Sequence, residues 1–107
     1  MSFYNRTNAA ESILKEGFRD NNGLVGALHL GIEGVFLSNV PLDCNEGAKG
    51  NQQLEVTFSA DYGLSHWELV EESGEQHYRE WCLPACLING NATVRLMTEE
   101  EEDEFYR

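Results

Sequence analysis

The chain has 107 residues, which is enough for one domain with a hydrophobic core and too few for two. Its formal net charge of -12 disfavours direct binding to nucleic acid, because an acidic surface repels phosphates. No apolar run approaches the ~20 residues that span a bilayer, and no basic-then-apolar leader begins the chain. We therefore expect a soluble, cytoplasmic protein without a membrane partner.

The first predicted elements are a short strand and a helix joined by a polar elbow. Phe3 and Tyr4 form a short extended run, and a polar turn follows it. Asn5, Arg6 and Thr7 then lie between a strand end and a helix N-terminus, where backbone N–H groups are unpaired. These three side chains are candidates for holding one ligand.

The predicted helix carries a signal at each end. Asn8 and Glu11 form a capping-box pattern, in which the two side chains bond each other's backbone N–H groups. Gly17 followed by Phe18 is typical of a helix end at which glycine takes a left-handed conformation and the next residue packs on the last turn. The pattern predicts a short helix that stops at Gly17.

The middle of the chain predicts a buried strand between two less certain segments. Residues 24–30 fit either a strand or a flap. Gly34–Ser38 is a continuous apolar run that suits a central strand buried on both faces. Pro41 can open a helix of about two turns over residues 42–48.

Residues 53–59 give the clearest half-buried strand, because three apolar residues alternate onto one face: Leu54, Val56 and Phe58. Residues 61–63 predict a turn, and residues 64–72 fit either a strand or a short helix.

The last part of the chain predicts two strands joined by a hairpin. Tyr78–Leu83 alternates, Pro84 closes it, and residues 85–88 continue extended to a two-residue turn at Asn89-Gly90. Thr93–Leu96 then returns as the paired strand. The fold class is α+β: a small mixed, mostly antiparallel sheet with one N-terminal helix and short additional helices.

An acidic run ends the chain. Thr98 can cap a short helix over residues 99–104, since acidic residues suit a first turn, but a frayed tail fits equally well. We therefore expect one domain over residues 1–98 and an acidic tail or short helix over residues 99–107. The acidic surface can also imitate DNA, although solubility is the simpler explanation.

No metal is expected. A nominal zinc set exists in Cys44, His77, Cys82 and Cys86, but Cys82 and Cys86 lie four apart across a proline and lack the tight spacing of a zinc knuckle. Buried, reduced thiols are the preferred interpretation.

Glu80 is the carboxylate that stands out, because it lies mid-strand beside Tyr78 and Trp81 rather than in a charge run. Partial desolvation would raise its pKa and suit it to act as a general base or as an acceptor for a ligand hydroxyl. The alternative is an ion pair with Arg79 or Arg95, and on residue type alone this alternative is favoured.

Three segments taken together resemble the three motifs of the ADP-ribosyltransferase fold, closest to the branch of diphtheria toxin and the poly(ADP-ribose) polymerases: Phe3–Thr7 with the helix that follows, Gly34–Asn39 and Tyr78–Pro84. The family binds NAD as a substrate and needs no metal. The resemblance implies transfer of ADP-ribose to a macromolecular acceptor, most simply a protein.

The resemblance also implies roles for individual residues. Asn5 stands where the family's histidine holds the nicotinamide ribose, and Thr7 stands beside the nicotinamide amide. Phe36 takes the place of a tyrosine that stacks on the nicotinamide ring, and Ser38 ends that strand. Glu80 matches the catalytic glutamate, which bonds the ribose and stabilises an oxocarbenium-like transition state.

The chain departs from the family at the first two motifs. Asn5 can bond a ribose hydroxyl but cannot carry a charge, and Phe36 lacks the phenol hydroxyl. NAD binding is therefore better supported than turnover. Arg6 is the arginine placed to hold phosphate, which is too few for an RNA 2′-phosphotransferase. The alternative function is a non-catalytic interaction protein that binds a basic partner through its acidic surface.

Overall fold

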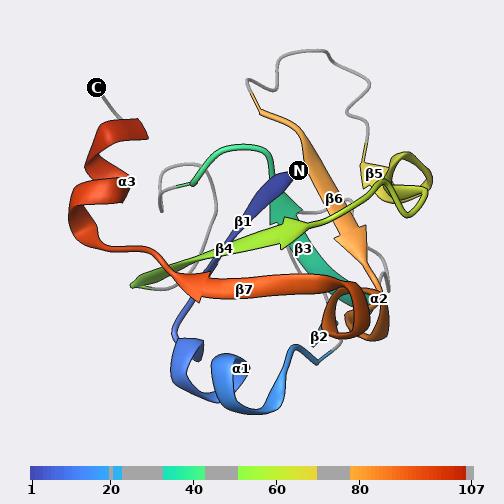
Figure 1. Cartoon of the computed structure of the whole chain (residues 1–107), viewed down its shortest axis with the longest axis horizontal. Helices are drawn as coiled ribbons and strands as arrows, with labels where there is room; N and C mark the ends of the chain where they lie inside the picture. The colour runs from blue at the N-terminus through green and yellow to red at the C-terminus, as the bar shows by residue number, and fades with distance from the viewer. Residues whose placement is uncertain (20, 23–32, 43–50, 70–77, 106–107) are drawn as a thin grey trace.

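An antiparallel sheet organises the protein, for which we obtained a computed structural model describing residues 1–19, 21–22, 33–42, 51–69 and 78–105. Six strands follow the order β5-β6-β3-β1-β4-β7, and β2 pairs with β3 (Figure 1). The strands are β1 (Ser2–Thr7), β2 (Asn21–Asn22), β3 (Glu33–Ser38), β4 (Gln52–Phe58), β5 (Glu68–Leu69), β6 (Glu80–Leu83) and β7 (Ala92–Leu96). The helices are α1 (Ala10–Glu16), α2 (Ala85–Asn91), α3 (Glu99–Phe105) and the 3-10 helix η2 (Leu64–Trp67). The predicted α+β class and mostly antiparallel sheet are confirmed.

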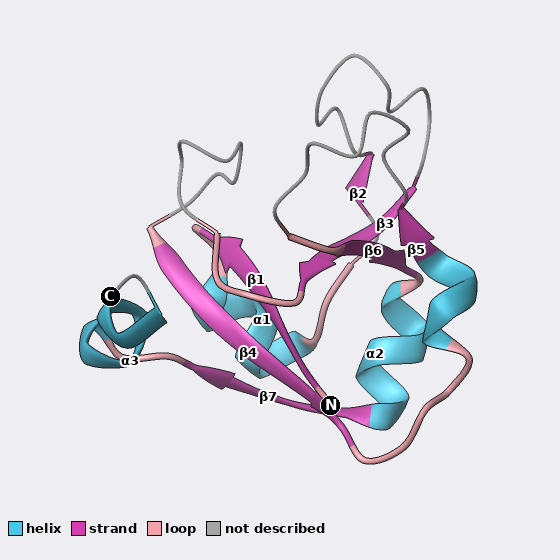
Figure 2. Ribbon diagram, turned by 90° about the horizontal axis from the view of Figure 1, so that it is seen from above, coloured by secondary structure: helices cyan, strands magenta, loops and turns pink. Residues whose placement is uncertain are grey.

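One face of this sheet forms the hydrophobic core. The three apolar residues of β4 are buried as predicted, with Leu54 and Val56 fully inaccessible. Residues from α1, α2 and η2 join the same cluster, including Ala10, Leu64 and Ile88. Figure 2 shows α1 and α2 on the same side of the sheet. Each large side chain buried in this way stabilises the fold by about 1.5–3 kcal/mol.

Strand β3 lies at the centre of the sheet between β6 and β1, as predicted. Val35 and Leu37 are buried in the core, and Ser38 is buried on the opposite face. At Gly34 the neighbouring strand β6 comes so close that an added Cβ would lie 2.7 Å from Cys82 Sγ and 2.9 Å from the Leu83 carbonyl oxygen. The glycine is therefore required by the close approach of these two strands.

The expected capping box at the start of α1 is wrong. The N-cap residue is Ala9, which makes no side-chain cap bond, and the Asn8 carbonyl oxygen Oδ1 accepts a hydrogen bond from the Asn51 backbone N–H at 3.0 Å instead. Asn8 thus ties the elbow to the approach of β4. The end of the helix agrees with its signal in part: Phe18 is buried in the core and Gly17 has a positive φ of 89°, but its ψ of 173° is extended, so the expected left-handed conformation is not formed.

The predicted hairpin at Asn89-Gly90 is also wrong, because residues 85–91 form α2. Pro84 sits at the N-cap, where its missing N–H costs nothing. Ala85 and Ile88, three residues apart, share the helix face that enters the core. Strand β7 therefore pairs with β4 rather than with the residues that precede it, and it forms one edge of the sheet.

The alternatives left open by the sequence are resolved where the chain is described. Residues 64–69 contain both a short helix and a strand, η2 followed by β5. The turn before η2 is confirmed, since Asp61 Oδ1 accepts hydrogen bonds from the Gly63 and Leu64 N–H groups. Pro41 and Leu42 lie in a loop rather than a helix. The predictions for residues 24–30, 43–48 and 70–72 lie outside the described residues.

The acidic run forms helix α3, the first of the two alternatives predicted for it. Thr98 Oγ1 accepts a hydrogen bond from the Glu101 N–H at 3.2 Å, and Glu101 Oε1 accepts one from the Thr98 N–H at 3.0 Å. This reciprocal pair is a capping box, and it fixes the start of α3.

Candidate functional site

The second face of the sheet, which we call the polar face, carries most of the predicted site residues. Alternation and register place these side chains on it: Tyr4, Arg6, Phe36, Ser38, Gln53, Glu55, Glu80, Cys82 and Arg95. The register sets Tyr4 opposite Ser38 and Ser38 opposite Glu80. Three neighbouring strands, β1, β3 and β6, thus bring these three residues into one row.

Ser38 uses its hydroxyl within the protein. The side chain is buried, and its hydroxyl donates to the Val40 carbonyl oxygen at 2.6 Å, with the Tyr4 carbonyl oxygen 3.3 Å away. Ser38 therefore shapes the turn after β3.

Asn5 and Thr7 alternate onto the face opposite to this row. The Asn5 amide Nδ2 donates to the Phe36 carbonyl oxygen at 2.9 Å. Strands β1 and β3 share one residue pair, Tyr4 with Ser38. Beyond this pair, the Asn5 side chain supplies the hydrogen bond to the backbone of β3 that strand pairing would otherwise make. The Thr7 hydroxyl accepts a hydrogen bond from the Ala9 N–H at 2.9 Å and stabilises the elbow.

Arg6 lies at the other end of the polar face in a half-buried network. Its Nε donates to the Leu42 carbonyl oxygen at 2.6 Å, and its Nη2 lies 2.7 Å from Glu102 Oε1 of α3. Both side chains of this ion pair are 14% exposed. The Gln53 amide Nε2 donates to the same Leu42 oxygen at 3.2 Å. The side-chain oxygen Oε1 of Gln53 is buried and has no hydrogen-bond partner among the described residues, which is a costly arrangement.

Glu80 and Phe36 are half-buried on the polar face. Glu80 lies opposite Ser38 on one side and Leu69 on the other, and Phe36 lies opposite Cys82. The two arginines considered as partners for Glu80 make ion pairs elsewhere. Arg79 binds Glu68, with its Nη2 2.6 Å from Oε1, and stacks over Trp81. Arg95 binds Glu55 at 2.9 Å and also Glu101.

The electrostatics of the polar face follow from these contacts. Burial, and next the negative charge of Glu55, raises the pKa of the Tyr4 hydroxyl, which keeps it a protonated hydrogen-bond donor. On the opposite face of the sheet, the hydrogen bonds from Arg79 lower the pKa of Glu68. Sequence reasoning missed Tyr4, Gln53 and Glu102, although strand alternation places Tyr4 on the same face as Arg6.

A separate pocket of about 480 Å³ opens beside the first turns of α1. Asn8, Ser12, Lys15 and Gln52 line part of it, and none of the predicted site residues does. This pocket is lined by one lysine and two glutamates, so no strong charge favours one ligand class.

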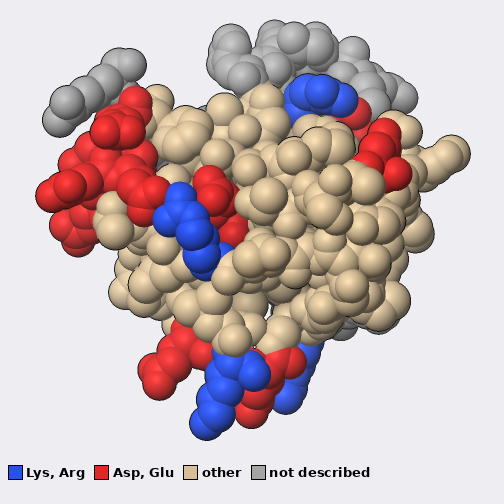
Figure 3. Space-filling model, in the orientation of Figure 1, with Lys and Arg blue, Asp and Glu red and all other residues tan. Residues whose placement is uncertain are grey.

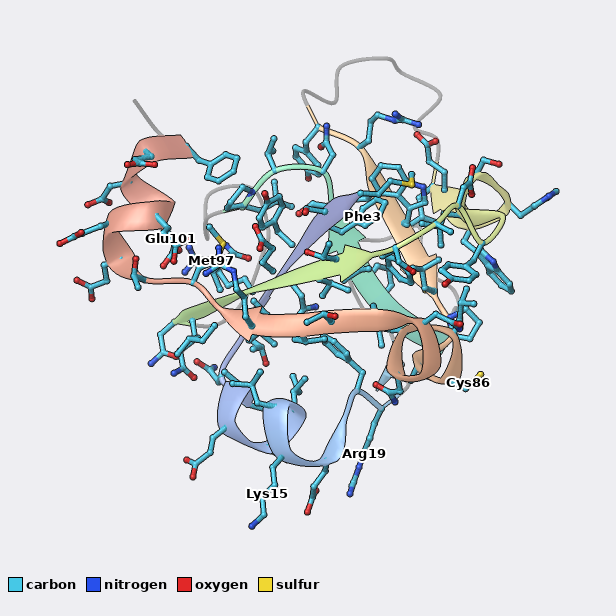
Figure 4. All side chains as sticks on the ribbon, viewed as in Figure 1. Phe3, Lys15, Arg19, Cys86, Met97 and Glu101 are labelled. Atoms are coloured by element: carbon cyan, nitrogen blue, oxygen red, sulfur yellow. The ribbon has the colours of Figure 1, made fainter. Side chains whose placement is uncertain are left out.

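In the described part of the chain, no group of three or more His, Cys, Asp or Glu side chains could hold a metal ion. Cys82 is buried in β6, and Cys86 lies exposed on α2 (Figure 4). Cys44 and His77 of the nominal zinc set lie outside the described residues. Across those same described ranges, no helix has the length and apolar character to cross a membrane.

Comparison of the chain with models of protein families, with curated proteins and with solved structures finds no match. The functional interpretation therefore depends on the geometry of the polar face and on the motif resemblance.

Proposed function

We propose that this protein is an ADP-ribosyltransferase-like enzyme that binds NAD on the polar face and transfers ADP-ribose to a macromolecular acceptor. One observation supports the proposal above the others. The three segments that carry the resemblance contribute β1, β3 and β6, which are neighbours in the sheet although they are far apart in the sequence. Helix α1 directly follows β1, as the family pattern requires.

In the proposed reaction, Glu80 is the catalytic residue. Its carboxylate bonds a ribose hydroxyl and stabilises the positive charge that develops as the bond between ribose and nicotinamide breaks. Nicotinamide leaves with the bonding electron pair. A nucleophile on the acceptor forms the new bond to the ribose carbon and loses its proton to solvent or to a nearby base.

Of the other predicted residues, Phe36 contacts the ligand in this proposal and Asn5 positions the protein backbone. Phe36 shares the polar face with Glu80 and offers a ring to the nicotinamide. Asn5 holds the Phe36 carbonyl oxygen from the opposite face, so in this proposal it positions the backbone of β3. A direct bond from Asn5 to the ribose would require its amide to leave that oxygen.

Titration calorimetry with NAD, combined with a nicotinamide-release assay, tests the proposal. We expect the native protein to bind NAD and release nicotinamide, and Glu80→Gln to keep binding while release falls by about 10²-fold or more. Glu68→Gln is the matched control, because it removes the same charge from the adjacent strand β5 and should keep full release. Absence of binding at millimolar NAD would contradict the nucleotide-binding proposal altogether.

A second candidate function is a non-catalytic interaction protein that binds a basic partner. The observation that favours it is the outward face of α3, where Glu99, Glu100, Asp103 and Glu104 are all exposed. Figure 3 shows acidic side chains gathered over this helix. Capture of a lysine-rich peptide that weakens as salt rises, and that Glu80→Gln leaves unchanged, would favour this function. Capture that persists at high salt would count against it.

A further inference from the structure

Helix α3 divides its side chains between two faces. Four carboxylates fall within one arc and point outward, as described above, whereas Glu101, Glu102 and Phe105 fall on the opposite arc. The inward residues make the contacts with the sheet: Glu101 with Arg95, Glu102 with Arg6, and Phe105 with Tyr4. The Tyr4 and Phe105 rings lie 5.2 Å apart between centroids. The helix therefore rests on the polar face through two ion pairs and one aromatic contact.

These contacts are weak compared with those of the other helices. No residue of α3 is buried, whereas α1 and α2 both bury residues in the core. A seven-residue helix is unstable by itself. Its outward pairs Glu99 with Asp103 and Glu100 with Glu104 are like charges four residues apart, which destabilise it further.

The residues that lead into α3 are fixed to the sheet. Met97 is buried, and its backbone N–H donates to the backbone carbonyl oxygen of Gln53 at 2.9 Å. Figure 4 shows Met97 and Glu101 close to the junction of β7 and α3. If α3 leaves the polar face, Met97 still holds its first residue close to that face. The helix can therefore bind again without a larger rearrangement of the chain.

We propose that α3 is a reversible acidic strap that closes over one end of the polar face by occupying Arg6, and that a ligand carrying phosphate oxygens opens it by competing for Arg6. The strap itself is independent of the enzyme reaction. Its opening by a ligand rests on the proposed function, because it takes the polar face as the ligand-binding face.

The geometry at Arg6 supports this competition. The Leu42 carbonyl oxygen holds Nε, so the guanidinium has a fixed orientation, and Nη2 is directed at a carboxylate oxygen of Glu102. A phosphate oxygen accepts a charge-assisted hydrogen bond from the same donor group. The ion pair is only 14% exposed on each side, so a phosphate oxygen that replaces Glu102 keeps a half-buried guanidinium paired with a negative charge.

The ¹⁵N relaxation order parameters of the α3 amides in the full chain test the strap. At low salt we expect values near about 0.85 in the native protein and below about 0.6 in Glu101→Gln/Glu102→Gln. Glu100→Gln/Glu104→Gln is the matched control, since it removes the same charge from the outward face of the same helix and should leave α3 rigid. A rigid α3 in the Glu101→Gln/Glu102→Gln variant would overturn the strap.

The same measurement with added anions tests the competition. At matched ionic strength, sodium pyrophosphate should lower the α3 order parameters further than sodium chloride does, and Arg6→Gln should abolish the difference. Equal effects of the two salts would overturn the role of Arg6. NAD in place of pyrophosphate separates the two proposals, because an effect of pyrophosphate without one of NAD supports the strap and counts against NAD as the ligand.

Discussion

At Gly17 the chain leaves α1 with a φ of 89°, a region that residues with a side chain rarely adopt. The conformation turns Phe18 back toward the core, where its backbone is clamped by Asn89 of α2. The Asn89 Oδ1 accepts from the Phe18 N–H at 2.8 Å, and its Nδ2 donates to the Phe18 carbonyl oxygen at 2.9 Å. One glycine and one amide thus join the ends of two helices that are distant in sequence.

Substitution of Gly17 by alanine should destabilise the protein by about 1–3 kcal/mol, because it adds a strained φ and places a Cβ 3.0 Å from the Asn89 side chain. Urea unfolding at constant m-value measures this loss. Gly90→Ala is the matched control. Apart from its neighbours and its own helix backbone, no atom of the described residues lies within 4 Å of its added Cβ, and alanine favours the helix, so stability should stay equal or rise by up to about 1 kcal/mol. Equal losses from both substitutions would contradict this account.

Residue types predicted much of the candidate site but not the use of each side chain. Alternation is enough to put Ser38 and Glu80 on strands, and the register then sets them opposite each other. The neighbouring sequence does not show whether a polar side chain is free to bind a ligand or is used in a hydrogen bond within the protein. Asn5 and Asn8 bond atoms 31 and 43 residues away, so their roles depend on contacts that only the complete fold creates.

At the scale of elements, β3 was predicted from its continuous apolar run and β4 from its alternation, and both strands place apolar residues in the core. The turn signal at Asn89-Gly90 failed, because a strong local preference for a hairpin was overridden by tertiary contacts. Ile88 is buried in the core and Asn89 is bound to Phe18, and both contacts need the helical backbone of α2. Because α2 takes the place of the expected hairpin strand, β7 pairs with β4 instead. A local turn signal could not predict this pairing.

The docking of α3 should depend on pH through Glu101. Hydrogen bonds from Arg95, and next from the Thr98 backbone, lower the pKa of Glu101 from 4.5 to about 2. A carboxylate whose pKa is depressed by folding stabilises the folded state above its unfolded pKa, and this contribution is lost as the pH falls from about 4.5 to about 2. The NMR cross-peaks between Tyr4 and Phe105 should weaken across that window. In Glu101→Gln they should be weak already at pH 7, and cross-peaks unchanged by the substitution would contradict the dependence.

At the scale of the whole molecule, acidic charge is in large excess. The formal charge is -12, and four arginines of the described chain are already paired with carboxylates: Arg6, Arg19, Arg79 and Arg95. The molecule extends over 33 × 32 × 24 Å. At ~10 mM salt the screening length of ~30 Å is as large as the protein, so nearly all its carboxylates repel one another, whereas at ~0.1 M it is ~10 Å.

Added salt should therefore stabilise the protein as a whole while it loosens α3. Screening relieves long-range repulsion across the molecule, and the exposed ion pairs that it weakens are worth at most about 1 kcal/mol each. The free energy of unfolding, measured in urea, should rise between about 10 mM and about 0.1 M sodium chloride. Replacing the four outward carboxylates of α3 with their amides should raise stability at low salt and flatten this dependence, because much of the repulsion is then gone. A decrease in stability with salt would instead mean that the ion pairs stabilise the protein more than the net charge destabilises it. In that case α3, which makes two of these ion pairs, would have to contribute to the stability of the sheet. The absence of buried residues in α3 argues against such a contribution.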